Sequence, residues 1–316
     1  MISIVKRGRT PPPPALHLTA TTTAPGQTVT LQQITHSVPT AIDWGDGVRS
    51  QVAANYAGTH THVYAATGVY AITVHKARAI TALDLEDAQL SCAGGTVGRL
   101  RGLTFLVLKN LPVVIGRGEI GGLALLGTLS MTDYSGLSNI TVGAGEIGGL
   151  KNLTFLTVWS LSGVTVGAGE VGGLPLLARL YLRIANGITI GAGELGGLSA
   201  SLTFIMLRSV PSVTPSAADF AALTKLENLS YLNSLSTATV DALMTAIYNA
   251  RMSYTYASTI ACDISTTNGA PTGAVQAPAP CPPANVGEMI YEQAKDTCGS
   301  GHKRWSVTYN GGVIAP

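Results

Sequence analysis

Charged residues are scarce in this sequence. Only 11% of the 316 residues are Asp, Glu, Lys or Arg, whereas ordinary soluble domains carry roughly 25%. The formal net charge of +2 indicates neither a nucleic-acid partner nor a membrane surface. We expect a chain with so few charges to cover part of its outer surface with neighbouring copies or other protein subunits.

Cysteines and long apolar runs are scarce too. The spacings of the four cysteines, Cys92, Cys262, Cys281 and Cys298, fit no zinc motif, and a chain of this length needs no disulfide framework. A disulfide among the last three and buried free thiols both remain open. No run of about 18 apolar residues exists to span a membrane. The basic residues within 1–9 are not followed by the apolar core of a secretory signal, so export would need another route.

What the sequence contains instead is a repeat. Between Ile80 and Leu232 the pattern Leu-x-x-Leu-x-Leu recurs about seven times at intervals of 23 to 27 residues, and the clearest copies follow a glycine-rich half such as 143–149. A period of this size indicates a solenoid, whose units bury their apolar faces only by stacking. The pattern resembles the leucine-rich repeat family, most closely its bacterial surface-protein type. The asparagine usual after the strand in that family is not kept.

Period-two alternation within each repeat assigns the two faces of its strand. The fourth and sixth positions point to the core, so the third, fifth and seventh should face the concave side. These positions hold three of the four phenylalanines of the chain together with other aromatics and arginines, a composition typical of binding surfaces. The predicted binding face consists of Phe105, Lys109, Phe155, Trp159, Arg179, Tyr181, Arg183, Phe204, Met206 and Arg208. The alternative is a structural stripe of aromatics that stack and stiffen the sheet.

Residues 15–78 contain short alternating, threonine-rich runs separated by turn signals, which is typical of a small β-sandwich. Residues 42–47, Ile-Asp-Trp-Gly-Asp-Gly, followed by His62-Val-Tyr64, resemble the polycystic-kidney-disease (PKD) type of immunoglobulin-like domain. Asp43 and Asp46 are expected to support the turn, because two carboxylates are too few for calcium. Only about six residues lead to the first repeat, too few for a flexible tether, so the sandwich should seal the edge of that repeat.

The two ends of the chain differ from the repeat. Residues 1–14 place Lys6, Arg7 and Arg9 before four prolines, which favours an extended arm. This arm either docks on another subunit or is a disordered terminus. The solenoid is expected over 79–235. Residues 236–316 begin with apolar residues at helical spacing and are predicted to form an α+β C-terminal cap.

The glycine-rich halves match a nucleotide-binding fingerprint without supporting one. Gly-x-Gly-x-x-Gly occurs at Gly116, Gly143, Gly167 and Gly191. The fingerprint requires a preceding strand, whereas here the strand follows, and the solenoid period already explains the recurrence. An acidic column should also stack at this period, and it either caps backbone amides or binds cations. Its members are Glu119, Glu146, Glu170, Glu194 and Asp219.

The predicted fold class is mainly β: a small PKD-like β-sandwich followed by a leucine-rich-repeat solenoid with an α+β C-terminal cap. We expect a non-enzymatic protein without catalytic, metal or cofactor residues. Its concave face should contact other protein subunits in a multi-copy assembly on a virion, as a capsid decoration or tail fibre, or on an extracellular surface. The alternative is a cell-surface adhesin or carbohydrate-binding module that recognises a surface glycan.

Overall fold

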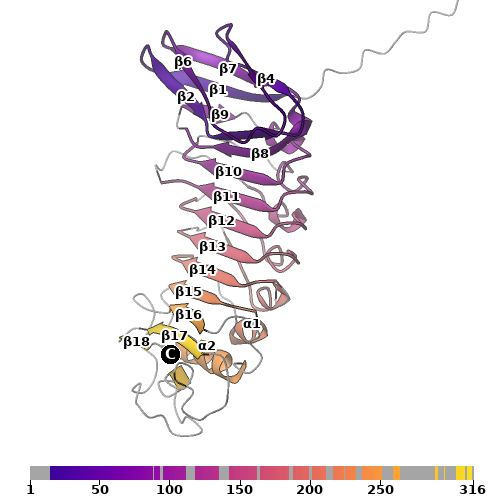
Figure 1. The fold of residues 1–316 in the computed structure, drawn as a ribbon. Helices are drawn as coiled ribbons and strands as arrows, with labels where there is room; N and C mark the ends of the chain where they lie inside the picture. Colours follow the sequence, from indigo (N-terminus) through magenta and orange to yellow (C-terminus); the bar gives the residue numbers. More distant parts are fainter. Residues whose placement is uncertain are drawn as a thin grey trace, which may run out of the picture.

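The computed structural model describes most of the chain from residue 15 onwards. The described residues are 15–87, 89–92, 95–111, 118–134, 142–161, 164–184, 188–198, 201–210, 216–223, 225–232, 237–250, 259–263, 289–290, 295, 304–309 and 312–314. The predicted arm with Lys6, Arg7 and Arg9 lies outside them, as do Cys281 and Cys298 and the side chain of Cys262. The fold is the mainly β architecture expected from the sequence, with a sandwich at one end of a stack of parallel strands (Figure 1).

The sandwich is built from two antiparallel sheets. The larger sheet has the order β5-β4-β7-β1-β9, and the smaller one pairs β2 with β6. These strands are β1 (Leu16–Thr22), β2 (Gln27–Leu31), β4 (Thr40–Asp43), β5 (Arg49–Val52), β6 (His60–Tyr64), β7 (Gly68–Val74) and β9 (Leu90–Cys92). Alternation along β1 buries Leu16, Leu18 and Ala20 and leaves the residues between them at least partly exposed.

The turn after β4 is held by the residues that carry the PKD resemblance. Trp44 and Tyr64 are fully buried, and the Tyr64 hydroxyl donates to the Trp44 carbonyl at 2.7 Å. The Asp43 carboxylate accepts a backbone N–H two residues further on at 3.1 Å. Asp46 does the same at 3.1 Å and contacts Nε2 of His62 at 2.6 Å. Both aspartates therefore have the turn-supporting role expected of them.

The sandwich and the solenoid exchange strands where they meet. Strand β3 (Gln33–His36) lies within the sandwich segment but pairs antiparallel with β8 (Ile80–Leu85), the first solenoid strand. Strand β9 follows β8 in the chain and pairs with β1 of the sandwich. Two sets of strand pairing, β3 with β8 and β9 with β1, therefore join residues on either side of the predicted boundary at 78. The edge of the first coil is covered by β3, which confirms that the sandwich seals it.

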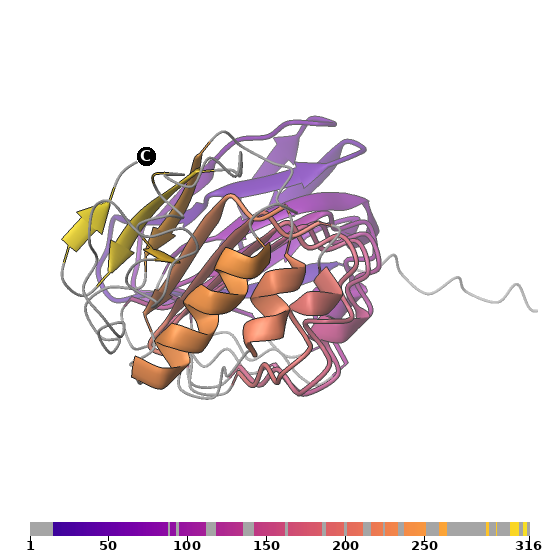
Figure 2. The same ribbon diagram turned by 90° about the horizontal axis from the view of Figure 1, so that it is seen from below.

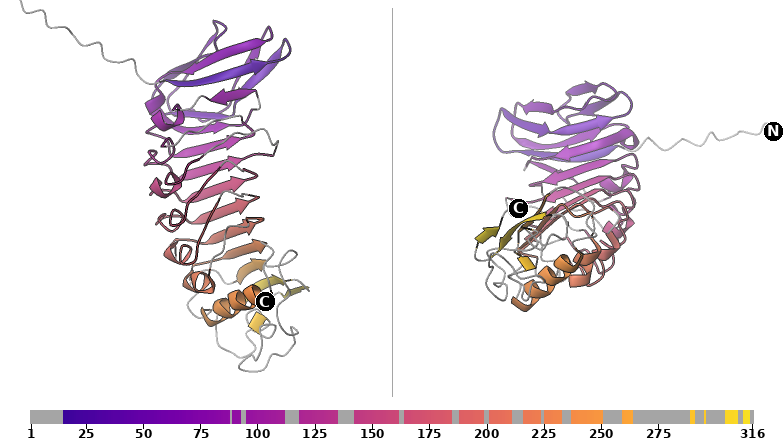
Figure 3. Two further views of the ribbon diagram at one scale, coloured as in Figure 1. Left: turned by 180° about the vertical axis from the view of Figure 1, so that it is seen from behind. Right: turned by 60° about the horizontal axis from the view of Figure 1, so that its bottom comes forward.

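The solenoid is built on parallel strands that pair in continuous register. They are β8, β10 (Phe105–Lys109), β11 (Thr128–Thr132), β12 (Phe155–Trp159), β13 (Arg179–Arg183), β14 (Phe204–Arg208) and β15 (Asn228–Leu232), stacked as Figure 3 shows. The fourth and sixth positions point inward: Leu106, Leu108, Leu129 and Met131 have no exposed surface. The repeat therefore produces one continuous apolar core through the stack.

Short helical turns close the opposite side of four coils. They are η2 (Val97–Arg99), η3 (Ile147–Gly149), η4 (Gly196–Leu198) and the helix α1 (Ala217–Ala222), while η1 (Ala77–Ala79) leads into β8. Gly145 has φ +90°, a conformation that glycine adopts without steric penalty. A Cβ on Gly149 would lie 2.8 Å from the carbonyl oxygen of Gly121 in the preceding coil. The glycines thus allow the coils to approach closely.

The predicted acidic column caps backbone amides. The Glu146 carboxylate accepts the N–H groups of Gly118 at 2.6 Å and Ile120 at 3.0 Å, both in the preceding coil. Glu170 repeats this one coil later at 2.6 and 3.1 Å, and Asp219 accepts two such bonds at 2.8 Å. Burial raises the pKa of Asp219, but its hydrogen bonds outweigh burial and leave the pKa below its ordinary value. These three carboxylates tie their coils to the ones before, whereas Glu194 accepts the N–H of Gly191 in its own coil at 2.9 Å.

The strand ladder continues beyond the end of the sequence repeat. Helix α2 (Thr237–Ala250), expected from the sequence, packs against α1 (Figure 2). Strands β16 (Thr259–Asp263) and β17 (Arg304–Tyr309) extend the parallel sheet from β15, and β18 (Gly312–Ile314) ends it antiparallel. The eleven-stranded sheet thus has an antiparallel strand at each end. No helix within the described ranges is long and apolar enough to cross a membrane.

Removing one carboxylate of the ladder should destabilise the solenoid. Glu146→Ala leaves two amides of the preceding coil without their acceptor, so we expect the free energy of unfolding to fall by about 3 kcal/mol. Urea titration followed by circular dichroism measures the change. The exposed Ala144 lies in the same turn, and Ala144→Ser should change stability by less than about 0.5 kcal/mol. Equal stability of the two variants would contradict a capping role.

The buried His36 predicts a loss of stability in acid. Burial and the nearby positive charges of His60 and Lys76 lower the pKa of His36 from 6.5 to about 4, against a smaller opposing effect of the His75 backbone. The unfolded chain therefore binds the extra proton between these pH values, and stability falls as the pH drops from 6.5 towards 4, by about 3 kcal/mol in total. Unfolding free energies across this range should show the slope in the wild type. His36→Leu should lose this dependence of stability on pH. An unchanged slope in the variant would show that other groups cause it.

Candidate functional site

The third, fifth and seventh repeat positions lie on one face of the solenoid sheet, as predicted. In β10 the residues at these positions are partly exposed, while the two leucines between them are buried. Strand pairing aligns the columns from coil to coil, so that Phe155 neighbours Arg179 and Arg179 neighbours Phe204. All ten residues of the predicted binding face therefore share one side of the sheet, the side that the repeat is expected to make concave. We refer to this side as the concave face.

Three rings of the concave face lie against one another, as one stacked pair and one tilted pair. The centroids of Tyr181 and Phe204 are 4.4 Å apart with their planes at 20°, and Phe155 lies 5.3 Å from Tyr181 on its other neighbouring strand. All three side chains are half-buried. The stacking expected for a structural stripe is thus present between Tyr181 and Phe204, and Tyr181 has an aromatic neighbour on each side.

A second cluster surrounds Trp159. The guanidinium carbon of Arg183 lies 4.2 Å from the centroid of the Trp159 ring, and the Tyr134 ring meets the tryptophan edge-on at 4.9 Å. Lys109 lies 5.7 Å from the centroid of Tyr134 and forms an ion pair with Glu86. Cation–π contacts of this kind hold long side chains in place.

Sequence reasoning missed Tyr134, which is 55% exposed. It stands two residues beyond the seventh repeat position, where the alternation rule no longer assigns a face. Its backbone N–H donates to the side-chain oxygen of Asn110 in the preceding coil at 2.8 Å. The sequence feature that could have indicated Tyr134 is Asn110, the residue after β10. Its side chain binds the backbone of the next coil and so positions the loop that carries Tyr134.

These residues enclose a groove of about 440 Å³ on the concave face. Its lining combines small hydroxyl side chains, aromatic rings and the cations Lys109 and Arg183. The lining residues are Val107, Lys109, Ser130, Thr132, Tyr134, Phe155, Thr157, Val158, Trp159, Tyr181, Arg183 and Met206. The volume lies in the range of ligand-binding pockets, and we call this site the concave groove.

Charge is divided along the concave face. Asp84 and Glu86 lie at the first coil, where burial and the neighbouring Glu86 charge raise the pKa of Asp84 despite the opposing effect of Lys109. The arginines Arg179, Arg183 and Arg208 lie at the fifth and sixth coils. Within the described part of the chain, none of these arginines is close enough to a carboxylate to form a salt bridge. The later coils therefore present net positive charge.

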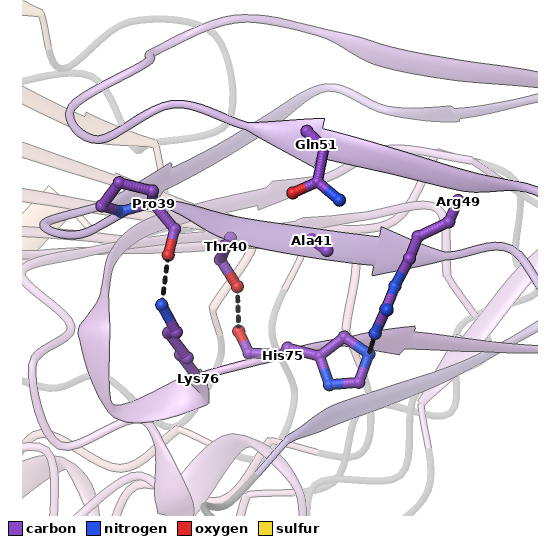
Figure 4. Close-up of a pocket in the computed structure, with 7 residues that line it drawn as sticks. All are labelled: Pro39, Thr40, Ala41, Arg49, Gln51, His75 and Lys76. Carbon is purple, nitrogen blue, oxygen red and sulfur yellow. Dashed lines mark hydrogen bonds between the residues drawn. The ribbon is translucent and has the colours of Figure 1, made fainter.

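A second cavity, of about 430 Å³, lies on the sandwich (Figure 4). The Arg49 guanidinium donates to Nε2 of His75 at 2.8 Å, which requires a neutral imidazole because arginine has no acceptor. Lys76 donates to the Pro39 carbonyl at 2.6 Å, and Thr40 donates to the His75 carbonyl at 2.7 Å. Arg49 and Lys76 already donate hydrogen bonds to protein acceptors. This cavity is therefore a weaker candidate for a binding site than the concave groove.

The structure gives no support to chemistry at the glycine-rich segments. The N–H of Gly145, which a bound phosphate would need, is taken by the Glu170 carboxylate at 2.6 Å, and that negative charge would repel phosphate. Among the residues described, no group of three or more His, Cys, Asp or Glu side chains could hold a metal ion. Burial raises the pKa of the Cys92 thiol to about 11, which disfavours a reactive thiolate.

The residue after each of several strands adopts a left-handed conformation. Asn110, Ser160, Ile184 and Ser209 all have φ between 50° and 56°. In this conformation the N–H of Ser160 donates to the carbonyl of Arg183 in the next coil at 2.9 Å, and that of Ile184 donates to Arg208 at the same distance. Ile184 is strained there, because β-branched residues rarely adopt positive φ.

The solved structures similar to this chain include bacterial leucine-rich-repeat proteins. One is a leucine-rich-repeat protein of Leptospira interrogans, at 20% identity and a TM-score of 0.43, matched over 60% of this chain and 44% of its own. Another is the functional domain of InlJ from Listeria monocytogenes, which includes a cysteine ladder, at 12% identity, a TM-score of 0.38, and 67% and 49% coverage. The chain thus spans about half the length of each. No protein-family model and no curated protein matches it.

Relieving the strain at Ile184 should stabilise the protein. Ile184→Asn places the residue found at the equivalent Asn110, so we expect the unfolding free energy to rise by about 1 kcal/mol. Ser209→Asn, at an equivalent but less strained position, should have a smaller effect. Thermal unfolding compares the three proteins. A lower melting temperature for Ile184→Asn would mean that contacts of the isoleucine side chain outweigh its backbone strain.

Proposed function

We propose that this protein binds a partner protein through its concave face. The observation that carries the proposal is the concave groove, whose lining combines aromatic rings, small hydroxyl side chains and an Arg183 held against Trp159. Aromatic residues and arginine are the side chains that contribute most to protein–protein interfaces. The face lies on a rigid ladder of strands, which lowers the conformational cost of binding.

The ring geometry favours a protein over a neutral glycan. A sugar packs its C–H groups flat against an open ring face. In the concave face, Tyr181 lies between Phe155 and Phe204, and Arg183 lies over the ring of Trp159. Rings that already have such neighbours, together with the guanidiniums, suit side chains and backbone carbonyls of a polypeptide better than a sugar ring.

The setting that we propose for this role is a multi-copy assembly on a particle or cell surface, with a virion component such as a capsid decoration or tail fibre as the leading case. The low content of charged residues, 11%, supports contact with other subunits, because the cores of interfaces between subunits are depleted in charge. Native mass spectrometry and negative-stain microscopy test this setting. A monomer at all concentrations, absent from any particle, would contradict it.

Selection of ligands on the purified protein tests the binding role. A random-peptide display library and a glycan array are screened in parallel against the full chain. Selected peptides should bind about 30-fold more weakly to Trp159→Ala and Tyr181→Ala, because aromatic anchors of interfaces contribute about 2 kcal/mol or more. Circular dichroism verifies that each variant is folded.

Tyr56→Ala is the matched control, since Tyr56 is an exposed aromatic of the sandwich, and it should bind as the wild type does. Peptides that bind all variants equally would show that the concave face is not the site. Saturable glycan binding that is lost in Trp159→Ala, with no peptide ligand, would replace the proposal with a carbohydrate-binding role.

A further inference from the structure

Two arginines of the concave face lie directly beside each other on neighbouring strands. Arg183 in β13 pairs in register with Arg208 in β14, and Arg179 lies at the other end of β13. Like charges at directly opposed positions of a sheet repel each other and destabilise it. If stability alone mattered, a neutral residue would be favoured at one of the two positions. A role in binding therefore explains the presence of both arginines better.

Arg183 is held ready to bind an anion. The Trp159 ring lies 4.2 Å from its guanidinium carbon and restricts the side chain. Its Nε is buried and has no hydrogen-bond partner within the described part of the chain. A buried donor without an acceptor is unfavourable, so this placement of Arg183 costs the fold stability, and the rest of the guanidinium is the part that a partner would contact. Arg49 and Lys76 of the sandwich, by contrast, already donate to protein atoms.

No described carboxylate of the concave face serves these arginines. Asp84 and Glu86 lie at the first coil, and Lys109 already pairs with Glu86. Arg179 and Arg208 are exposed to solvent. The positive potential at the fifth and sixth coils is therefore available to a partner, and it adjoins the concave groove through Arg183.

We infer that the partner presents an acidic polypeptide segment, whose carboxylates bind Arg183 and Arg208 while a neighbouring large side chain enters the concave groove. A carboxylate matches the planar fork of a guanidinium with two parallel hydrogen bonds. Two adjacent guanidiniums select a segment with more than one Asp or Glu. The inference rests on the proposed protein-binding function and specifies the chemistry of its partner.

Two synthetic peptides test the preference for acidic residues. The first is fluorescein-labelled Gly-Ser-Glu-Glu-Trp-Glu-Glu-Gly-Ser, and the second replaces every Glu with Gln. Fluorescence anisotropy on the full chain should give a Kd about 10-fold or more lower for the Glu peptide at about 0.05 M salt, with the difference shrinking at about 0.3 M salt as screening increases. Absence of binding by the Glu peptide, or equal binding of both peptides, overturns the inference.

Charge-removing variants locate the site. Arg183→Gln and Arg208→Gln should each weaken binding of the Glu peptide about 10-fold, whereas Arg78→Gln, which removes an exposed arginine of η1 outside the concave face, should leave it unchanged. Arg208→Gln should also keep or raise the melting temperature, because it removes the repulsion from Arg183. If Arg208 had a purely structural role, Arg208→Gln would instead lower the melting temperature and leave peptide binding unchanged.

Two further outcomes separate this inference from the proposed function. If both peptides bind equally and both are lost in Tyr181→Ala, the concave face still binds protein but has no acidic preference. If neither peptide responds to Tyr181→Ala, Arg183→Gln or Arg208→Gln, the concave face is not a protein-binding site. Saturable binding of 3′-sialyllactose that is lost in Arg183→Gln would assign the arginines to an acidic glycan and overturn the acidic-segment inference.

Discussion

The dependence of every coil on its neighbours governs this structure. Each repeat contributes inward leucines from a single short strand, and these are buried only when the next coil covers them. The acidic column adds a polar counterpart on the opposite side, because Glu146 and Glu170 satisfy amides that belong to the preceding coil. Apolar burial and charge-assisted hydrogen bonds therefore act between coils, and both depend on the same spacing.

That dependence also explains how the stack ends. A parallel ladder leaves unpaired backbone groups at its first and last strands, and such edges invite pairing with other chains. Here β3 pairs antiparallel at one end and β18 at the other. Because β3 comes from the sandwich segment and β9 returns to it, the sandwich is joined to the first coil by two sets of strand pairing.

Unfavourable features gather at the fifth and sixth coils. Arg183 and Arg208 are adjacent like charges, the Nε of Arg183 is a buried donor without a partner, and Ile184 has φ 50°. Elsewhere in the described solenoid the inward leucines and the left-handed turn glycines recur in register, although one carboxylate oxygen of Asp84 at the first coil is also buried without a hydrogen-bond partner. Local departures from such consistency are expected where binding is favoured over stability. Arg183 lines the concave groove, and Ile184 and Arg208 are its neighbours in the chain and on the next strand, which is why we place the functional site there.

The sequence by itself determined the register of the solenoid and hence which residues share the concave face. Seven in-phase copies of a period-two pattern allow only one assignment of inward leucines, and a shift of one residue would have exposed all of them. Phe105, Phe155 and Phe204 accordingly lie on the concave side. The acidic column was visible in the same way, since its members recur at the repeat period.

Only the tertiary structure decided how side chains from different coils combine. The contacts of Tyr134 with Trp159 and of Arg183 with the same ring join residues about one coil apart in sequence, and rotamers and loop paths determine them. The exchange of β3 and β9 and the parallel continuation through β16 and β17 likewise join segments that no local pattern relates. Periodicity determines the direction in which a side chain points, whereas packing determines what it meets there.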